Sequence, residues 1–291
     1  MTTSQRPIRS QPATEQISDV FQARRVCAAA LEQTLDELFE RPGITELQFR
    51  DTWLAKIASN PTMTLDGWYS PPPKGATVLA APAFAPRRLN FKSLRDPSCF
   101  PKDEPIRWRE GWLYAYCSNL SVPLRFAGDF SITLYFGHDD AVLRYYRLAL
   151  SVARELALRS LALECSGQVF RLGQTLLHNH GLTNTVHSVT DVSPLDYGHS
   201  LMKVDSCLSV QTSNLSEEVR ETVSRSRKFI NDVTNWRLAD VDAYTIEPQV
   251  KAIQSKQFPK LSFHYLLTQR HGQAIEASGE PLIQRYLGEN P

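Results

Sequence analysis

Apolar residues recur at helical spacing near the start of the chain, from about Thr14 to Glu40. Arg24 interrupts this apolar stripe, so we predict that the helix is only partly buried near its start. The stripe comprises Ile17, Val20, Phe21, Cys27, Ala28, Leu31, Leu35, Leu38 and Phe39. The spacing predicts one long amphipathic helix.

A second helix is predicted after a short break. Pro42 and Gly43 end the first helix, because neither residue continues a helix well. Thr45 is a good N-cap, and Gln48, three residues later, completes a capping-box pattern. The second helix then runs to about Ala58, so the chain is predicted to begin with a helical hairpin.

Residues 60–105 are rich in proline, which excludes a long helix there. The same stretch carries aromatic side chains and is too apolar for a free linker. We expect one short strand within 75–84 and predict that the rest packs over the core and roofs a pocket. Alternation of side chains predicts further strands at 111–122 and from Asp129 to Phe136.

A second pair of helical segments follows. One long helix is predicted over 138–167, and a short helix or helix-turn over 173–189. Two helices followed by strands therefore occur twice, which predicts an α+β fold with two pseudo-symmetric halves that share one sheet. We expect residues 1–13 to form a disordered tail and residues 14–291 to form a single domain.

Two residues between 190 and 250 carry candidate chemistry. His199 follows a glycine, and Glu247 lies in a β-branched run, where its carboxylate points to one face of a sheet. If that face is inward, the carboxylate must be paired, protonated or bound to metal. A single histidine and a single glutamate are more often solvated or structural. Residues 216–232, which separate the two, are predicted to form a solvated helix or insertion.

Composition narrows the classes of function. The chain has 291 residues, 42% hydrophobic and 22% charged, which is typical of a folded protein. A formal net charge of +1 gives no indication of a nucleic-acid partner. Neither a membrane-spanning apolar run nor the apolar core of a secretory signal is visible. Five scattered cysteines without a C-x-x-C pattern indicate reduced thiols, so we expect a cytoplasmic protein.

Four motifs together resemble the pita-bread metallopeptidases, which include methionine aminopeptidase, prolidase, aminopeptidase P and the non-peptidase creatinase. These motifs are "ERPGITELQF", "GDFSITLYFG" with Asp129 and Thr133, "YGHS" with His199, and "TIEP" with Glu247. The resemblance implies a pita-bread fold, in which a duplicated antiparallel sheet carries helices on its outer face. It also implies that the chain corresponds to the catalytic domain alone.

The family holds two divalent ions with two aspartates, one histidine and two glutamates. Asp129, His199 and Glu247 match three of these ligands, whereas Ser118 and Asn119 stand where the first aspartate is expected. His264 stands in the place of the last glutamate. Two dications beside two carboxylates would leave a net local charge of about +2, which is costly in a poorly hydrated site.

We therefore expect no metal cofactor. The alternative is one divalent ion (zinc, manganese or iron) held by Asp129, His199, Glu247 and His264. Without metal, the same four residues are acid/base groups. The resemblance adds His187 as a further catalytic candidate. Candidate substrate-binding residues are Ser118, Asn119, Thr133 and Tyr116.

Three functions remain open. The first is a non-peptidase enzyme, as creatinase is within this fold, which acts on a small amino-acid-like substrate by acid/base chemistry. The second is a metal-dependent aminopeptidase or prolidase with an unusual ligand set. The third is a pseudoenzyme that binds a peptide or a protein. We favour the first, because His264 replaces one functional group with another. We expect no nucleic-acid or membrane partner and leave open a homodimer or a partner protein.

Overall fold

The computed structural model describes most of the chain, but only residues 225–232 of the segment predicted over 216–232. His187 and the first twelve residues of the predicted tail lie outside the described residues. The described ranges are 13–69, 72–91, 93–108, 111–121, 128–186, 188, 191–201, 225–255, 257–270 and 272–288.

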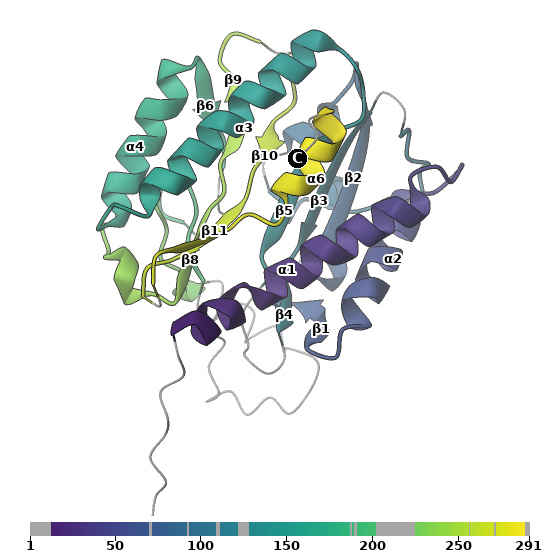
Figure 1. Cartoon of the computed structure of the whole chain (residues 1–291). Coiled ribbons are helices and arrows are strands. Elements are labelled where there is room, and N and C mark those ends of the chain that lie inside the picture. Colours follow the sequence, from purple (N-terminus) through teal and green to yellow (C-terminus); the bar gives the residue numbers. More distant parts are fainter. Residues whose placement is uncertain are drawn as a thin grey trace, which may run out of the picture.

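The predicted repeat of two helices followed by strands is present (Figure 1). The first half contains α1 (Ala13–Leu38), α2 (Glu46–Ala58), β1 (Met63–Gly67), β2 (Ala76–Pro82), β3 (Gly111–Cys117), β4 (Asn119–Ser121) and β5 (Phe130–Tyr135). The second half contains α3 (Asp140–Ser160), α4 (Ser166–Asn179), β6 (Leu182–Asn184), β7 (Ser200–Leu201), β8 (Ala243–Ile246), β9 (Gln249–Ala252), β10 (Leu261–Ser262), β11 (Tyr265–Thr268), β12 (Ala274–Glu276) and α6 (Glu280–Leu287).

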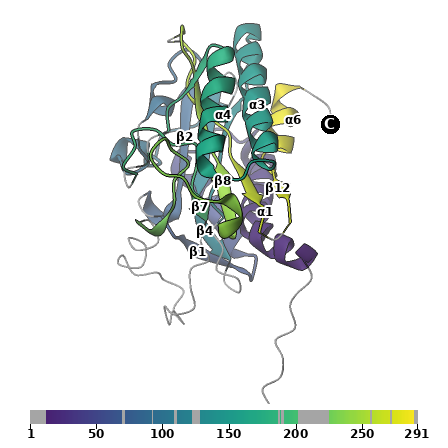
Figure 2. The ribbon, with the colours of Figure 1, turned by 90° about the vertical axis from the view of Figure 1, so that its left-hand side faces the viewer.

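The described strands form four antiparallel sheets rather than the one continuous sheet that the repeat suggested. Their orders are β2-β3-β5, β12-β11-β8-β7, β10-β9-β6 and β1-β4. Strands β5 and β10 are joined through a side chain. The backbone N–H of Ser262 on β10 donates to Thr133 Oγ1 on β5 at 2.9 Å. Figure 2 shows α1, α3 and α6 together on one side of the strands. This agrees with the predicted helical outer face.

The start of α2 is as predicted. Thr45 Oγ1 accepts the Gln48 N–H at 3.3 Å, and Gln48 Oε1 accepts the Thr45 N–H at 3.1 Å. This capping box satisfies two backbone donors that a helix start leaves free. The helices α1 and α2 then pack as the expected hairpin.

The long helix predicted over 138–167 is present as α3 but ends at Ser160, because the chain breaks between α3 and α4. Cys165 has extended backbone angles, with φ −141° and ψ 158°. The Gln168 side-chain oxygen accepts the N–H groups of Glu164 and Cys165. The carbonyl of Glu164 accepts the Leu238 N–H at 3.0 Å, so a distant segment holds the break in place. None of the described helices has the length and apolar character needed to cross a bilayer.

The predicted partial exposure at Arg24 is wrong. Its side chain is completely buried, whereas its neighbour Arg25 is about half exposed. The apolar stripe of α1 packs against α2 and the β2-β3-β5 sheet. Arg24 lies on that buried side, and its polar partners come from strands far along the chain.

Candidate functional site

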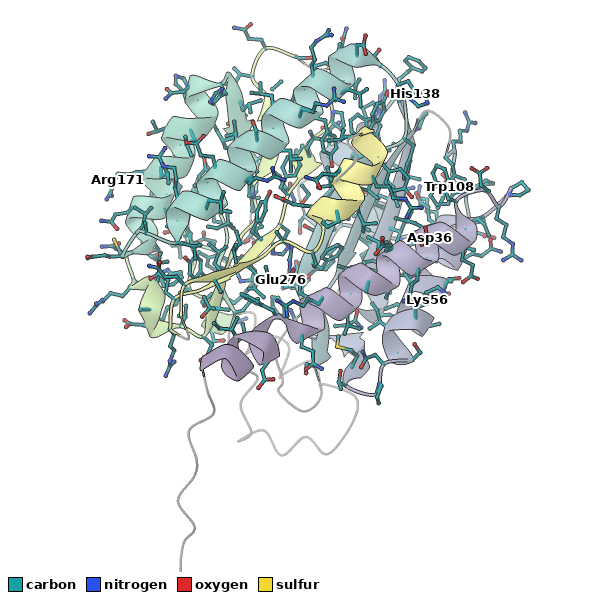
Figure 3. All side chains as sticks on the ribbon, viewed as in Figure 1. Asp36, Lys56, Trp108, His138, Arg171 and Glu276 are labelled. Atoms are coloured by element: carbon teal, nitrogen blue, oxygen red, sulfur yellow. The ribbon has the colours of Figure 1, made fainter. Side chains whose placement is uncertain are left out.

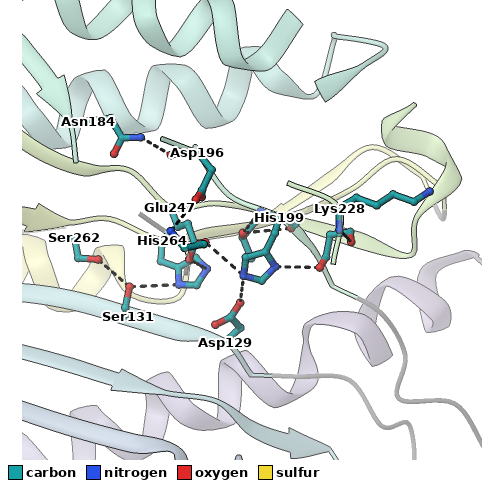
Figure 4. Close-up of polar contacts among 12 residues, drawn as sticks. Asp129, Ser131, Asn184, Asp196, His199, Lys228, Glu247, Ser262 and His264 are labelled. Carbon is teal, nitrogen blue, oxygen red and sulfur yellow. Dashed lines mark hydrogen bonds and ion pairs between the residues drawn. The ribbon is translucent and has the colours of Figure 1, made fainter. Parts of the chain in front are cut away.

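Four strand ends bring the predicted acid/base residues together. Asp129 immediately precedes β5, His199 precedes β7, Glu247 follows β8 and His264 precedes β11. Strands β7, β8 and β11 are neighbours in one sheet, so three of these residues share one end of it. Asp129 approaches them from the β2-β3-β5 sheet (Figure 4).

The four side chains form a chain of short polar contacts. His199 Nε2 lies 3.3 Å from Asp129 Oδ2 and 3.4 Å from Glu247 Oε1. The second oxygen of Glu247, Oε2, lies 3.5 Å from His264 Nε2. Glu247 therefore stands between the two imidazoles, and His199 stands between the two carboxyl groups.

The His199 ring is held in one orientation. Its Nδ1 lies 3.0 Å from the carbonyl oxygen of Ser200, so Nδ1 carries a proton and donates it there. Edge contacts with the rings of Trp68 and Phe229 confine the imidazole. Burial and the charge of Arg227 act to lower the pKa of His199, but the two neighbouring carboxyl groups outweigh them and raise it. His199 thus gains a proton on Nε2 readily.

His264 behaves in the opposite way. Burial, and then the positive charge of Arg24, lower the pKa of His264 well below its usual value, so its ring is neutral. Its Nδ1 lies 3.4 Å from Ser131 Oγ, which in turn lies 2.9 Å from Ser262 Oγ. The two histidines therefore differ in charge although they flank the same glutamate.

The pKa values of the two carboxyl groups, Glu247 and Asp129, also differ. Burial raises the pKa of Glu247 to about 8, and the charges of Asp129 and Asp196 add to this effect. Burial would also raise the pKa of Asp129, but the hydrogen bond and charge of His199 hold it at about 2. Near neutral pH the site thus contains one ionised and one protonated carboxyl group. In such a pair the protonated group, Glu247, can deliver a proton, while the ionised group, Asp129, stabilises positive charge.

Gly198 is required by the close approach of β7 to β8. Its φ is +143°, and a Cβ at this position would lie 2.1 Å from the carbonyl oxygen of Thr245. The Thr245 hydroxyl accepts the His199 N–H at 3.0 Å, and the Thr245 N–H donates to the His199 carbonyl at 2.8 Å. A glycine before the histidine therefore allows the backbone contact that places the imidazole.

A pocket opens over the site, and the proline-rich stretch covers it as predicted. Tyr69, Phe91 and Leu94 from that stretch line the pocket. His264 is not among the lining residues and lies behind Glu247. The other lining residues are Ser93, Tyr114, Tyr116, Asp129, Ser131, Val186, Ser188, His199, Arg227, Glu247, Gln249 and Ser262.

The predicted substrate-binding residues divide into two groups. Tyr116 lines the pocket, whereas Ser118, Asn119 and Thr133 are buried outside it. Ser118 Oγ donates to the carbonyls of Tyr69 and Gly75 at 3.1 Å each, which ties the roof to the sheet. Because Cα partners in β3 and β5 share a face, Tyr116 lies opposite Ser131 and points into the pocket with it. Phenol groups thus face the pocket from β3.

One lining residue follows from strand alternation. Tyr114 lies two positions before Tyr116 on β3, and residues two apart in a strand share a face, so both phenols are on the pocket side. Ser131 and Ser262 were not predicted. Ser262 lies on β10, in a different sheet from β11, so alternation from His264 does not indicate it.

Arg227 was missed because residues 216–232 were predicted to be solvated. In the described part of that segment, Phe229, Ile230 and Asn231 are buried, which corrects the prediction there. The Arg227 guanidinium lies 4.9 Å from the ring centre of Trp68 and 5.1 Å from that of Phe229. No periodic pattern in the sequence marks this arginine. The predicted catalytic residue His187 lies outside the described residues.

The donor atoms suit one divalent ion better than two. Asp129, Glu247 and His264 each offer one ligand atom, all within 4.8 Å of one another. Asp129 Oδ2 is buried and faces His199 Nε2 at 3.3 Å, and His264 Nε2 is buried and faces Glu247 Oε2 at 3.5 Å, so each atom could instead bind a metal ion. Two carboxylates and two imidazoles match a single zinc, manganese or iron ion. The described lining residues include no third carboxylate that could hold a second ion.

No protein-family model and no curated protein matches this chain. Solved structures do. An X-Pro aminopeptidase from Thermotoga maritima aligns with a TM-score of 0.56 at 13% identity, over 91% of this chain and 61% of its own. A prolidase from Pyrococcus horikoshii OT3 aligns with a TM-score of 0.57 at 10% identity, over 92% of this chain and 62% of its own. The chain thus spans about three-fifths of these two proteins.

A methionine aminopeptidase from Rickettsia prowazekii is similar along almost its whole length. It aligns with a TM-score of 0.55 at 14% identity, over 91% of this chain and 97% of its own. At such low identity the likeness concerns the fold. The chain has the α+β pita-bread fold of these metallopeptidases, as predicted.

Proposed function

We propose that this protein is a non-peptidase enzyme on a pita-bread fold, which acts on a small amino-acid-like substrate by acid/base chemistry. The observation that carries the proposal is the contact chain of Asp129, His199, Glu247 and His264, in which neighbouring contacts measure 3.3–3.5 Å. These contacts place a carboxyl group with a raised pKa, Glu247, and an ionised carboxylate, Asp129, on either side of His199.

Each residue has a role that follows from its surroundings. Glu247, with a pKa raised to about 8 and a place in the pocket lining, serves as general acid. Asp129 remains ionised and stabilises positive charge on His199 or on a substrate amine. His264 is neutral and orients Glu247 from behind. His199 exchanges protons with both carboxyl groups.

The charges around the pocket support an amino-acid-like substrate. The Arg227 guanidinium and the Asp129 and Glu247 carboxyl groups line the same pocket. A zwitterion can place its carboxylate at the arginine and its ammonium at the carboxyl groups, because each charge then meets its opposite. Between these charges, aromatic rings provide apolar contact for the body of the substrate. Tyr69, Phe91, Tyr114 and Tyr116 supply those rings.

The test is a thermal-shift screen with zwitterionic amino acids, their amides and their N-acetyl derivatives. A ligand that binds the folded state raises Tm. We expect free amino-acid-like compounds to raise Tm, and derivatives that lack either charge to have a smaller effect. His199→Ala should remove the shift. His178→Ala, an exposed change in the last turn of α4, should preserve it.

A shift that is equal for the zwitterions and for both neutralised derivatives would contradict the substrate assignment. A shift that survives in His199→Ala would contradict the site. Turnover of any hit is then compared in Glu247→Gln, where we expect a loss of about 10²–10⁴-fold in kcat, the usual size of a general acid–base effect.

A second candidate is a one-ion metallohydrolase of the aminopeptidase or prolidase type. The buried atoms Asp129 Oδ2 and His264 Nε2 favour it, because both belong to the Asp129, Glu247 and His264 cluster whose ligand atoms could bind one metal ion. A bound divalent ion would lower the pKa of a water molecule and so supply a hydrolytic nucleophile. Asp129, Glu247, His199 and His264 would hold it.

Metal analysis of the purified protein separates the two candidates. Plasma mass spectrometry before and after dialysis against manganese, cobalt and zinc should show far less than one equivalent if the first proposal holds. One equivalent in the wild type that is lost in His264→Ala would favour the hydrolase instead. Dipeptide and Xaa-Pro substrates would then be the compounds to assay.

A further inference from the structure

Helix α1 places one arginine inside the protein next to the site. Arg24 has 0% of its surface exposed, and its guanidinium lies 5.2 Å from the ring centre of Phe130. A buried guanidinium loses its water, which costs several kcal/mol unless other polar groups replace that water. The polar groups that hydrogen-bond to the buried guanidinium therefore show which parts of the protein Arg24 holds in place.

The partners of Arg24 are the backbone carbonyls of two site residues. Nη1 donates to the carbonyl oxygen of Asp129 at 2.9 Å, and Nη2 donates to the carbonyl oxygen of His264. These residues precede β5 and β11, which belong to different sheets. The guanidinium of Arg24 thus joins two sheets next to the site. One sheet presents Asp129 to His199, and the other presents His264 to Glu247.

Asp129 has a backbone conformation that requires support. Its φ is +32°, in the left-handed region that residues other than glycine rarely adopt. Such conformations persist where the surrounding structure holds them, and they cluster at functional sites. The hydrogen bond from Arg24 acts on the carbonyl of this same residue. The Asp129 side chain then meets His199 Nε2 at 3.3 Å.

A buried carboxylate balances the charge of Arg24. Glu276 on β12 is 4% exposed, and its negative charge is the strongest influence that favours the charged form of Arg24. Figure 3 shows Glu276 close to α1. Arg24 does not line the pocket, so it has no direct access to a bound substrate.

We propose that Arg24 is a positioning residue, which sets the spacing of Asp129 and His264 by holding both of their carbonyl groups. The chemistry that this spacing serves rests on the proposed function, whereas the positioning itself can be measured without substrate. Arg24 is absent from the four motifs and enters the site only through the backbone.

The experiment compares three variants by NMR of the histidine rings, with His199 and His264 assigned through their His→Gln variants. Arg24→Met removes the fork, and Arg24→Lys retains a cation that cannot span both carbonyls. We expect the ring resonances of His199 and His264 to shift in Arg24→Met and to shift less in Arg24→Lys. The control Trp53→Phe removes another buried hydrogen bond to α1, from indole Nε1 to the Cys27 carbonyl.

Trp53→Phe should lower Tm but leave both ring signals in place. Wild-type ring resonances in either Arg24 variant would overturn the positioning role, whatever the change in Tm. If Arg24→Met does not fold, Arg24→Lys decides the question alone. If the Arg24 variants shift the histidine ring resonances but the thermal-shift screen finds no amino-acid-like ligand, only the proposed function is overturned. If the screen finds such a ligand but the ring resonances do not shift, only the positioning role is overturned.

Discussion

At the scale of single residues, the site is defined by groups whose protonation differs from that in water. Glu247 and Asp129 are both carboxyl groups, yet one has a pKa of about 8 and the other of about 2. Burial raises the pKa of both groups, and the hydrogen bond and charge of His199 overcome this effect at Asp129 but not at Glu247. A third carboxyl group, Asp196, lies just behind this cluster and is completely buried.

Asp196 provides a prediction about stability and pH. Burial raises its pKa from 3.8 to about 6, so folding favours its protonated form. The stabilisation from protonated Asp196 is fully present below the pKa of the unfolded state, about 3.8, and is lost as pH rises through the pKa of the folded state, about 6. Asp196→Asn keeps an oxygen that can accept the Ser188 N–H and avoids the buried charge. We expect it to be more stable than the wild type by about 3 kcal/mol at pH 8 and about half of that at pH 5.

Urea unfolding of both proteins between pH 5 and 8 tests this prediction. Asp103→Asn, which changes an exposed carboxylate, is the control and should leave the pH profile unchanged. A stability difference between Asp196→Asn and the wild type that does not grow with pH would show that Asp196 is not a buried charge.

At the scale of elements, the strand ends of the site were predictable, whereas the long-range supports were not. Asp129 was predicted to begin a strand and Glu247 to lie within one, and the structure places them directly before β5 and directly after β8. The burial of Arg24 was mispredicted, because periodicity does not reveal carbonyl partners 105 and 240 residues away. The break after α3 was missed for the same reason, since it depends on the backbone of Leu238.

The β7–β8 approach provides a prediction at this scale. Gly198→Ala places a methyl group 2.1 Å from the Thr245 carbonyl, so the strands must separate and His199 must move. We expect a loss of several kcal/mol in unfolding free energy together with altered His199 ring resonances, because overpacking and strained φ add. Gly43→Ala is a matched control, since Gly43 also has positive φ (+76°) but no atom within 4 Å of a Cβ there.

Gly43→Ala should cost about 1 kcal/mol, the cost of a left-handed backbone alone. Denaturant unfolding measures both variants. Equal losses in the two would mean that backbone angle, and not the contact with Thr245, makes Gly198 necessary.

At the scale of the whole molecule, single polar side chains join elements from distant parts of the chain. Glu280, at the start of α6, accepts hydrogen bonds from Arg154 on α3 and from the Tyr265 hydroxyl on β11. The C-terminal helix is thereby fixed to a helix and to a strand of the site sheet. The repeat and its helical face were predictable from pattern, but this junction depends on atoms that only the folded chain brings together.

We predict that Glu280→Ala destabilises the protein by about 1–3 kcal/mol, because it removes the hydrogen bonds that Glu280 accepts from Arg154 and from the buried Tyr265 hydroxyl. Glu155→Ala removes the exposed ion pair with Arg159 on α3 and should cost less than about 0.5 kcal/mol. Thermal and urea unfolding would compare the two. A similar small loss in both would show that the Glu280 junction contributes no more than a surface pair.

The Arg24 contacts also affect the order of events during synthesis. Helix α1 leaves the ribosome before the strands of the site, and the chain must extend a further 105 residues to supply Asp129 and 240 to supply His264. Until both carbonyls exist, the guanidinium keeps its water, and that face of the helix cannot be buried without cost. Contacts so distant in sequence form late and expose intermediates to aggregation. A nascent chain that stalls before β11 should therefore still need protection by chaperones, although most of its helices are complete.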